Sequence, residues 1–132
     1  MSLDPLAILA ILFGLQAKHF LFDFVFQSDW QVRNKGIYGH PGGIAHAGLH
    51  GVGTLVVLGL CSAFGVLSLP LAAALAIADF AIHYHVDWAK ARIARKLYLT
   101  PERSGFWVAL GADQAAHQAT YLLLLVVLIA AL

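Results

Sequence analysis

The chain has 132 residues, of which 61% are hydrophobic and 11% charged, with a formal net charge of +1 at pH 7. Soluble domains average about 45–50% apolar and about 25% charged residues, so the composition excludes an ordinary soluble domain and indicates an integral membrane protein. A large soluble enzyme with a single anchor is excluded because apolar segments fill nearly the whole sequence. The single cysteine, Cys61, excludes an internal disulfide and a cysteine-rich metal site.

Four apolar runs reach the length of about 20 residues that a transmembrane helix needs. The first lacks a basic leader and a cleavage site, so it is predicted to be a retained span. The second follows the chain-breaking HPGG at 40–43, and the third continues as a helix through the basic KARIARK. The predicted spans cover residues 4–27, 43–64, 69–92 and 105–132.

Polar residues next to prolines predict where three of these helices begin. Asp4 precedes Pro5, and Ser68 precedes Pro70. In TPER, Thr100 is the expected N-cap with Pro101 at the first helical position.

Basic residues predict the orientation. Arg33 and Lys35 lie between the first two spans, and five more basic residues lie between or flank the last two, whereas the connection between spans two and three is uncharged. The positive-inside rule then places both termini on the non-cytoplasmic side. These basic residues are expected to set the membrane topology and to contact anionic lipid headgroups, and not to bind nucleic acid. The predicted fold is an all-α, four-transmembrane-helix bundle forming a single domain.

Each span carries polar residues spaced four apart, which places both side chains on one helical face. All four pairs fall in the cytoplasmic half of the bilayer, and Asp79 lies about two turns deeper than Asp87. The pairs are His19 and Asp23, His46 and His50, His83 and Asp87, and Asp113 and His117.

The cost of burying these groups points to a metal site. A carboxylate in the centre of a membrane helix costs about 2.5–3.5 kcal/mol, yet four of the seven acidic residues and six of the seven histidines lie in spans. One or two divalent ions would satisfy them, and His and Asp ligands without thiolates suit zinc, manganese or iron. The predicted ligands are His19, Asp23, His46, His50, His83, Asp87, Asp113 and His117.

Further polar residues lie beside these pairs. Gln27 and Gln114 are candidates for hydrogen bonds that orient the ligands, and Asp79 for a supporting or substrate contact. Lys90 could bind a phosphate, extend its charged end to the membrane surface or pair with Asp87, and the last two roles are favoured. His85 and His40 are not predicted to be ligands.

The first and third spans repeat a pattern. HFLFDF and HYHVDW share a histidine, three residues, an aspartate and an aromatic residue. The spans that follow carry HxxxH and DxxxH, so we expect a duplicated helical hairpin that builds two facing half-sites.

The ordered motifs HFLFDFVFQSDW, HAGLH, HYHVDWAK and DQAAH resemble the bacterial membrane family catalogued as domain of unknown function 3307. The resemblance covers essentially the whole chain. It implies a small multi-span protein of the bacterial cytoplasmic membrane, without an assigned activity. The ligand types are also similar to those of membrane-bound metal-dependent hydrolases, an analogy that carries little weight without aligned sequence.

These observations favour an intramembrane metal-dependent hydrolase that acts on a lipid or lipid-linked substrate at the cytoplasmic leaflet. No serine nucleophile motif is present, so water is the expected attacker, with Asp23 or Asp113 as the general base. The same site could instead serve a metal-ion or proton transporter, which would need a homodimer. Haem binding and purely structural His–Asp contacts stay open as alternatives.

Overall fold

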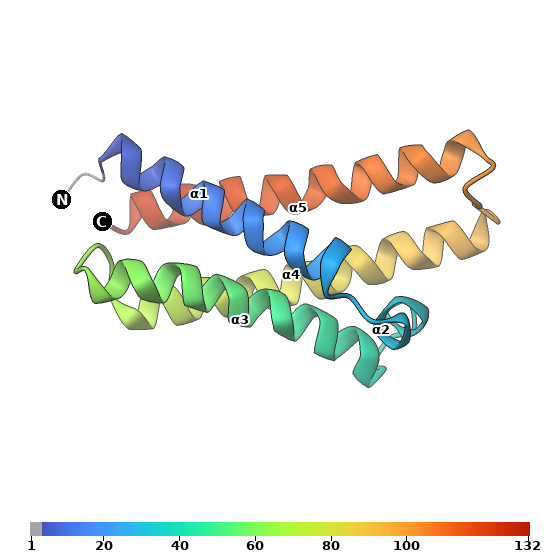
Figure 1. Cartoon of the computed structure of the whole chain (residues 1–132), viewed down its shortest axis with the longest axis horizontal. Helices are drawn as coiled ribbons and strands as arrows, with labels where there is room; N and C mark the ends of the chain where they lie inside the picture. The colour runs from blue at the N-terminus through green and yellow to red at the C-terminus, as the bar shows by residue number, and fades with distance from the viewer. Residues whose placement is uncertain (1–3) are drawn as a thin grey trace.

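The computed structural model describes residues 4–132, which contain helices and connecting turns and no strand. Four helical segments are long and apolar enough to cross a membrane. The first of them continues from α1 into η1, a single π-helical turn (Figure 1). The elements are α1 (Pro5–Phe20), η1 (Leu21–Val25), α2 (Asp29–Asn34), α3 (Pro41–Ala63), α4 (Leu69–Lys96) and α5 (Ser104–Ala130).

Side-chain caps explain why three of the long helices begin where they do. Asp4 accepts a hydrogen bond from the Leu6 amide, and Ser68 accepts one from the Leu71 amide, as predicted. His40 caps α3 by accepting from the Gly42 amide, so that helix begins at Pro41, two residues before the predicted span.

The predicted start of the last helix is wrong. Thr100 does not cap α5, which begins at Ser104 after Arg103. The Thr100 carbonyl instead accepts the Arg103 amide at 2.8 Å, and the Pro101 carbonyl accepts the indole N–H of Trp107 at 2.9 Å. The Thr100 side chain forms a hydrogen bond with the exposed Glu102 carboxyl, which lowers the pKa of that carboxyl. TPER therefore forms a turn instead of the first turn of the helix.

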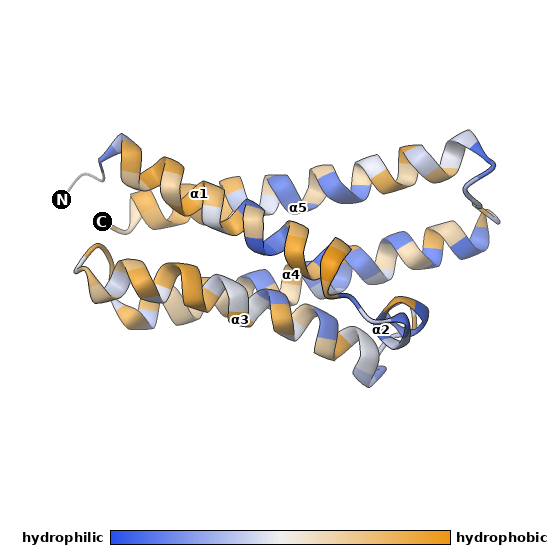
Figure 2. Cartoon of the chain, viewed as in Figure 1, coloured by the Kyte–Doolittle hydropathy of each residue, from blue (hydrophilic) through white to orange (hydrophobic). Residues whose placement is uncertain are grey.

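The bundle has an apolar end and a polar end. The start of α1, the end of α5 and the α3–α4 turn lie together at one end (Figure 1). Buried side chains such as Ile11, Leu58 and Leu128 form a continuous apolar core towards it. Hydrophilic segments gather further along the helices and at the opposite end, where α2 lies (Figure 2).

The protein has polar groups inside and apolar groups outside. Phe13 is 75% exposed and Val108 72%, whereas His50 and His83 are 0% exposed. Such a surface would be unfavourable in water but is the arrangement that a bilayer favours. Four apolar helices with a polar interior identify a membrane protein.

The π-helical turn η1 changes the direction of side chains at the end of the first span. The Phe26 amide donates to the Leu21 carbonyl at 2.8 Å, five residues back, so the helix contains one extra residue in this turn. α3 packs closely here, because a Cβ added at Gly53 would lie 2.6 Å from the Phe22 ring. Asp23 lies within this turn.

Candidate metal centre

All eight side chains predicted as ligands lie together in the interior of the bundle. They come from α1, η1, α3, α4 and α5, and their side chains are at most 5% exposed. Whether they bind a metal depends on the directions of their nitrogen and oxygen atoms.

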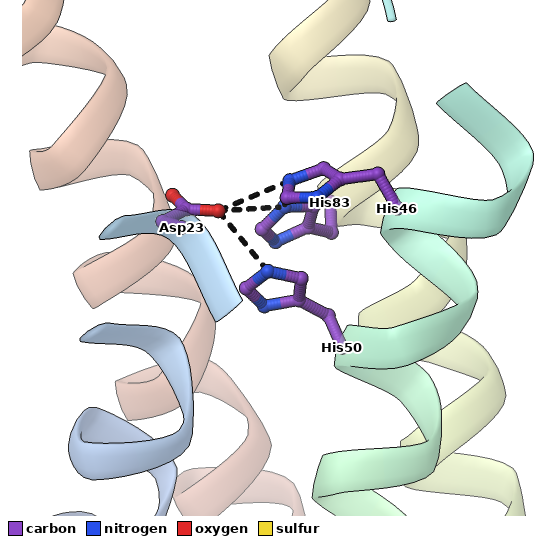
Figure 3. A group of neighbouring side chains, drawn as sticks. All are labelled: Asp23, His46, His50 and His83. Atoms are coloured by element: carbon purple, nitrogen blue, oxygen red, sulfur yellow. Dashed lines mark hydrogen bonds and ion pairs between the residues drawn. The ribbon is translucent and has the colours of Figure 1, made fainter. Parts of the chain in front are cut away.

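The first group surrounds one carboxylate oxygen. Asp23 Oδ1 lies 3.0 Å from His46 Nε2 and 3.1 Å from His50 Nε2. His83 Nε2 lies 3.8 Å from the same oxygen, and Figure 3 shows the three rings pointing towards it from α3 and α4. One ligand atom from each of the four residues lies within 4.8 Å of the others.

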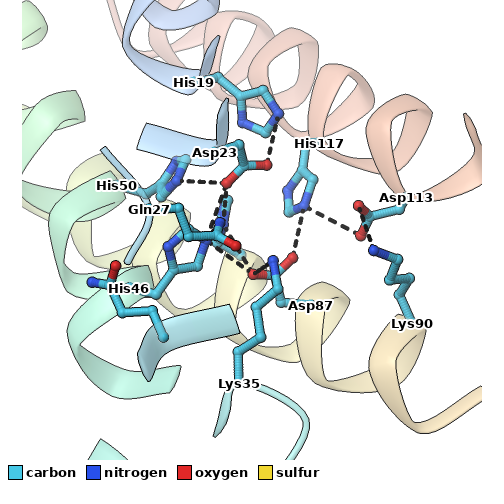
Figure 4. A network of polar contacts seen from close by, with 12 residues as sticks. His19, Asp23, Gln27, Lys35, His46, His50, Asp87, Lys90, Asp113 and His117 are labelled. Carbon is cyan, nitrogen blue, oxygen red and sulfur yellow. Dashed lines mark hydrogen bonds and ion pairs between the residues drawn. The ribbon is translucent and has the colours of Figure 1, made fainter. Parts of the chain in front are cut away.

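The second group lies beside the first, and one of its members, Asp87, also contacts a histidine of the first group. Asp87 Oδ1 is 3.4 Å from His117 Nε2, which is 3.6 Å from Asp113 Oδ1. The other oxygen, Asp87 Oδ2, is 3.1 Å from His46 Nε2. The Asp87 carboxylate therefore connects the two groups (Figure 4).

The separations between these atoms are compatible with a shared metal ion. Among the described residues, several fully buried ligand atoms have no hydrogen-bond partner although another polar atom is close. They include Asp23 Oδ1, His50 Nε2, both oxygens of Asp87, Asp113 Oδ1 and His117 Nε2. Two atoms that bind one tetrahedral ion at about 2.1 Å lie about 3.4 Å apart, which resembles the separations found here. The buried groups could thus hold a divalent ion.

His19 is the member least free to bind an ion. Its Nδ1 lies 2.9 Å from the Tyr121 hydroxyl, and its Nε2 lies 3.0 Å from Gln114 Oε1. A ring that donates to the Gln114 oxygen carries its proton on Nε2, so Nδ1 accepts from Tyr121. Although His19 also lies near His83 and His117, its hydrogen bonds suit a residue that orients Asp23, at 3.3 Å.

The predicted neighbours lie near the ligands. Gln27 Nε2 is 3.3 Å from His46 Nε2. Gln114 contacts His19 and also donates to Asp113 Oδ2 at 3.3 Å. Both glutamines are therefore placed to orient ligand side chains.

Lys90 does not pair with Asp87, contrary to one of its three predicted roles. Its Nζ lies 4.0 Å from Asp113 Oδ2 on α5. The partner of Asp87 is Lys35, whose Nζ is 3.2 Å from Asp87 Oδ2. The connection that contains α2 folds back over the polar end and brings Lys35 to this position.

A buried ion pair beside the cluster involves a lysine that the sequence analysis did not identify. Lys18 Nζ lies 2.6 Å from Asp79 Oδ2, and the Thr54 hydroxyl donates to the same oxygen at 2.6 Å. Lys18 also donates to the His50 carbonyl at 3.1 Å. Asp79 therefore pairs with Lys18 and does not join the two groups of candidate ligands. The sequence feature that could have predicted this pair is a lysine inside an otherwise apolar span.

The two remaining histidines lie outside the cluster. His85 is exposed on α4, with ring nitrogens near the Ala81 carbonyl and the Tyr38 hydroxyl. His40 caps α3. Neither is placed to bind an ion in the interior.

Comparison with known proteins gives one match. The family model described as "Protein of unknown function (DUF3307)" matches residues 11–132, in agreement with the sequence motifs. No curated protein and no solved structure matches the chain. The likeness to metal-dependent hydrolases gains no support from these comparisons.

Proposed function

The chain belongs to the DUF3307 family of proteins of unknown function, and from that premise we propose that it is an intramembrane metal-dependent hydrolase. Its substrate is a lipid or lipid-linked molecule at the cytoplasmic leaflet. The observation that carries this proposal is the convergence of buried imidazole nitrogens and carboxylate oxygens, several of which have no hydrogen-bond partner among the described residues.

The two groups define two candidate ion positions. Asp23, His46, His50 and His83 form the first, and Asp87 and His117, with Asp113 beside them, the second. Their nitrogen and oxygen donors suit zinc, manganese or iron. A bound divalent ion makes a coordinated water nucleophilic near neutral pH and polarises the bond to be cleaved.

We assign the general base to Asp113 rather than Asp23. Asp23 Oδ1 is surrounded by three imidazole nitrogens, which suits a ligand, whereas Asp113 lies at the edge of the cluster and also lines a groove. The water oxygen adds to the carbonyl carbon or phosphorus, and its proton passes to Asp113. The bond to the leaving oxygen then breaks, and that oxygen takes up the proton, so the reaction involves no redox change.

The orientation and ancestry of the bundle are part of the proposal. The helix α2, which contains Arg33 and is capped by Lys35, and the α4–α5 loop lie at the polar end (Figure 1), which the positive-inside rule assigns to the cytoplasm of a bacterial cell. The hairpins formed by α1–α3 and by α4–α5 derive from a duplication. In support, Asp23 faces histidines of α3 while Asp87 faces His117 of α5.

The test combines elemental analysis with a lipid-hydrolysis screen on detergent-purified protein. We expect one or two equivalents of zinc, manganese or iron in the wild type, and loss of metal and turnover in a His50→Ala, Asp87→Ala double variant. Asp113→Asn should keep at least one ion but lose turnover about 100-fold, within the usual range for a general base. His85→Ala is the matched control, since this exposed histidine lies outside the cluster.

Two results would contradict the proposal. A wild type without metal after supplementation would reduce the cluster to contacts between helices. Bound metal together with lipid turnover unchanged in His50→Ala would remove the hydrolase assignment.

Transport of a metal ion or proton is the second candidate. The Lys18–Asp79–Thr54 contacts extend the polar interior from His50 towards the apolar end, as a pathway would require. The core of Ile11, Leu58 and Leu128 closes that end, which favours hydrolysis. Divalent-ion flux into proteoliposomes that disappears in His50→Ala would establish transport instead.

A further inference from the structure

An open groove of about 670 Å³ runs between α4 and α5 from the cluster to the loop that joins these helices. Its walls are apolar, with Val86 and Ala116 at the inner end and Leu97 and Leu99 at the outer end. Such a volume is within the range of about 300–1,000 Å³ typical of small-molecule sites.

Small side chains keep the groove open. Ala109, Ala112 and Ala116 line it from α5, and Ala89 lines it from α4. Larger residues at these positions would close the space between the helices. Figure 1 shows that this end of the α4–α5 hairpin extends beyond the ends of α1 and α3. No other long helix of the described chain covers it there.

The groove has one charged end, and that end meets the cluster. Lys90 and Asp113 are its charged lining residues, and their side chains lie 4.0 Å apart. Asp113 Oδ1 is in turn 3.6 Å from His117 Nε2. A chain molecule in the groove with a polar linkage at Lys90 and Asp113 would hold that linkage beside the candidate ions.

The surroundings of the groove favour a negatively charged amphiphile. The end of the hairpin where the groove meets the α4–α5 loop carries exposed cations, opposed by the single exposed carboxylate of Glu102. Cations beside a membrane surface attract anionic headgroups. They are Arg92, Arg95, Lys96 and Arg103.

We propose that the α4–α5 groove binds an acyl chain of an anionic glycerophospholipid and holds its ester or phosphoester linkage at Lys90 and Asp113. The proposed binding site depends only on the shape and lining of the groove. The role of that lipid as substrate rests on the proposed hydrolase function.

Photo-crosslinking in vesicles tests the site on the full-length, metal-supplemented protein. The probe is phosphatidylglycerol with a diazirine in one acyl chain, carried in phosphatidylcholine vesicles, and mass spectrometry locates the adducts. We expect adducts concentrated on residues 86–116 and about tenfold weaker labelling there in Ala112→Phe, whose ring fills the groove. Ala115→Phe adds the same ring at an exposed position of α5 that does not line the groove and should label like the wild type.

A milder variant and a second probe complete the test. Ala109→Leu should also reduce labelling, and unchanged metal content in each variant shows that the bundle is intact. The matched phosphatidylcholine probe should label the groove less than phosphatidylglycerol. Adducts spread evenly over all lipid-facing helices, equal labelling by both probes, or a pattern unchanged in Ala112→Phe would overturn the proposal.

The outcomes separate this inference from the proposed function. Selective groove labelling without turnover of any lipid would keep the binding site and remove the hydrolase. Metal-dependent turnover that is unchanged in Ala112→Phe would keep the hydrolase and remove the groove.

Discussion

At the scale of single residues, two carboxylates dominate the interior of the bundle. Asp23 contacts four histidines, His19, His46, His50 and His83. Asp87 contacts three histidines and Lys35. A buried carboxylate in a membrane needs a cation or donors around it to remain charged. A bound ion and its imidazole ligands would meet that need for both.

Asp23→Asn keeps the size of the side chain but removes its charge. We expect metal affinity to fall at least about 100-fold, because an amide is a poor ligand and even indirect partners of a metal contribute about 10–100-fold. Titration with zinc in the presence of a competing chelator measures the loss. Asp29→Asn is the control, since Asp29 is exposed and pairs only with Arg33 at 3.2 Å. Equal affinity in Asp23→Asn and the wild type would exclude Asp23 as a ligand.

The Lys18–Asp79 pair makes a prediction about stability. Lys18→Met leaves Asp79 buried without its cation, and losing one partner of a buried ion pair costs about 3–5 kcal/mol in the free energy of unfolding. Unfolding in mixed detergent micelles measures this loss, and adding Asp79→Leu should restore part of it. Arg33→Met breaks a surface pair instead and should change the free energy by less than about 1 kcal/mol. If Lys18→Met is as stable as Arg33→Met, the Lys18–Asp79 pair does not stabilise the bundle.

At the scale of elements, spacing of four residues was sufficient to predict which side chains share a helical face. It could not predict which atoms meet across helices, because that depends on how each helix is rotated in the bundle. The pairing of Lys35 with Asp87 and of Tyr121 with His19 are examples. Caps were predictable where the side chain bonds the adjacent backbone, as at Asp4 and Ser68.

The π-helical turn has no comparable local signature. It lies inside an apolar run that predicts an ordinary α-helix. The close contact between Phe22 and Gly53 arises from the packing of α3 against this turn, which the local sequence does not encode. No helix was predicted in the connection that contains α2, although Ser28 and Gln31 form the capping box at its start. The spans and the residues that gather in the interior were therefore predictable, while the turn that directs Asp23 into the cluster was not.

Deleting Leu21 tests the role of this turn. Removing one residue should restore a regular α-helix and move Asp23 by about 100° around the helix axis, away from His46 and His50. We expect loss of at least one metal equivalent by elemental analysis. Leu21→Ala keeps the residue count and alters only a side chain that is 39% exposed, so it should retain the metal. Full metal content in the deletion variant would show that the turn does not position Asp23.

At the scale of the whole molecule, the polar end and the apolar end imply different surroundings. The polar end carries α2, the α4–α5 loop and the basic residues, whereas the α3–α4 turn at the other end has no charge. The cluster lies nearer to the polar end. A substrate from the leaflet at that end would reach it without crossing the apolar core.

Accessibility labelling tests this orientation. With Cys61 replaced by alanine, a cysteine at Glu102 should react with an impermeant maleimide only from the cytoplasmic face, and one at Gly65 only from the opposite face. Inside-out vesicles and intact spheroplasts provide the two faces, and each serves as the control for the other. The reverse pattern would invert the positive-inside assignment and place the cluster near the other leaflet.

The distribution of the cluster over the chain has a consequence for biosynthesis. Asp23 lies in the first span, while Asp113 and His117 lie in the last. The ribosome therefore delivers Lys18 and Asp23 to the insertion machinery well before their partners exist, at about 2.5–3.5 kcal/mol for each charge near the bilayer centre. The early helices must remain beside the translocon until α5 is synthesised. If the cluster holds an ion as proposed, its loading would also have to wait until α5 is in place.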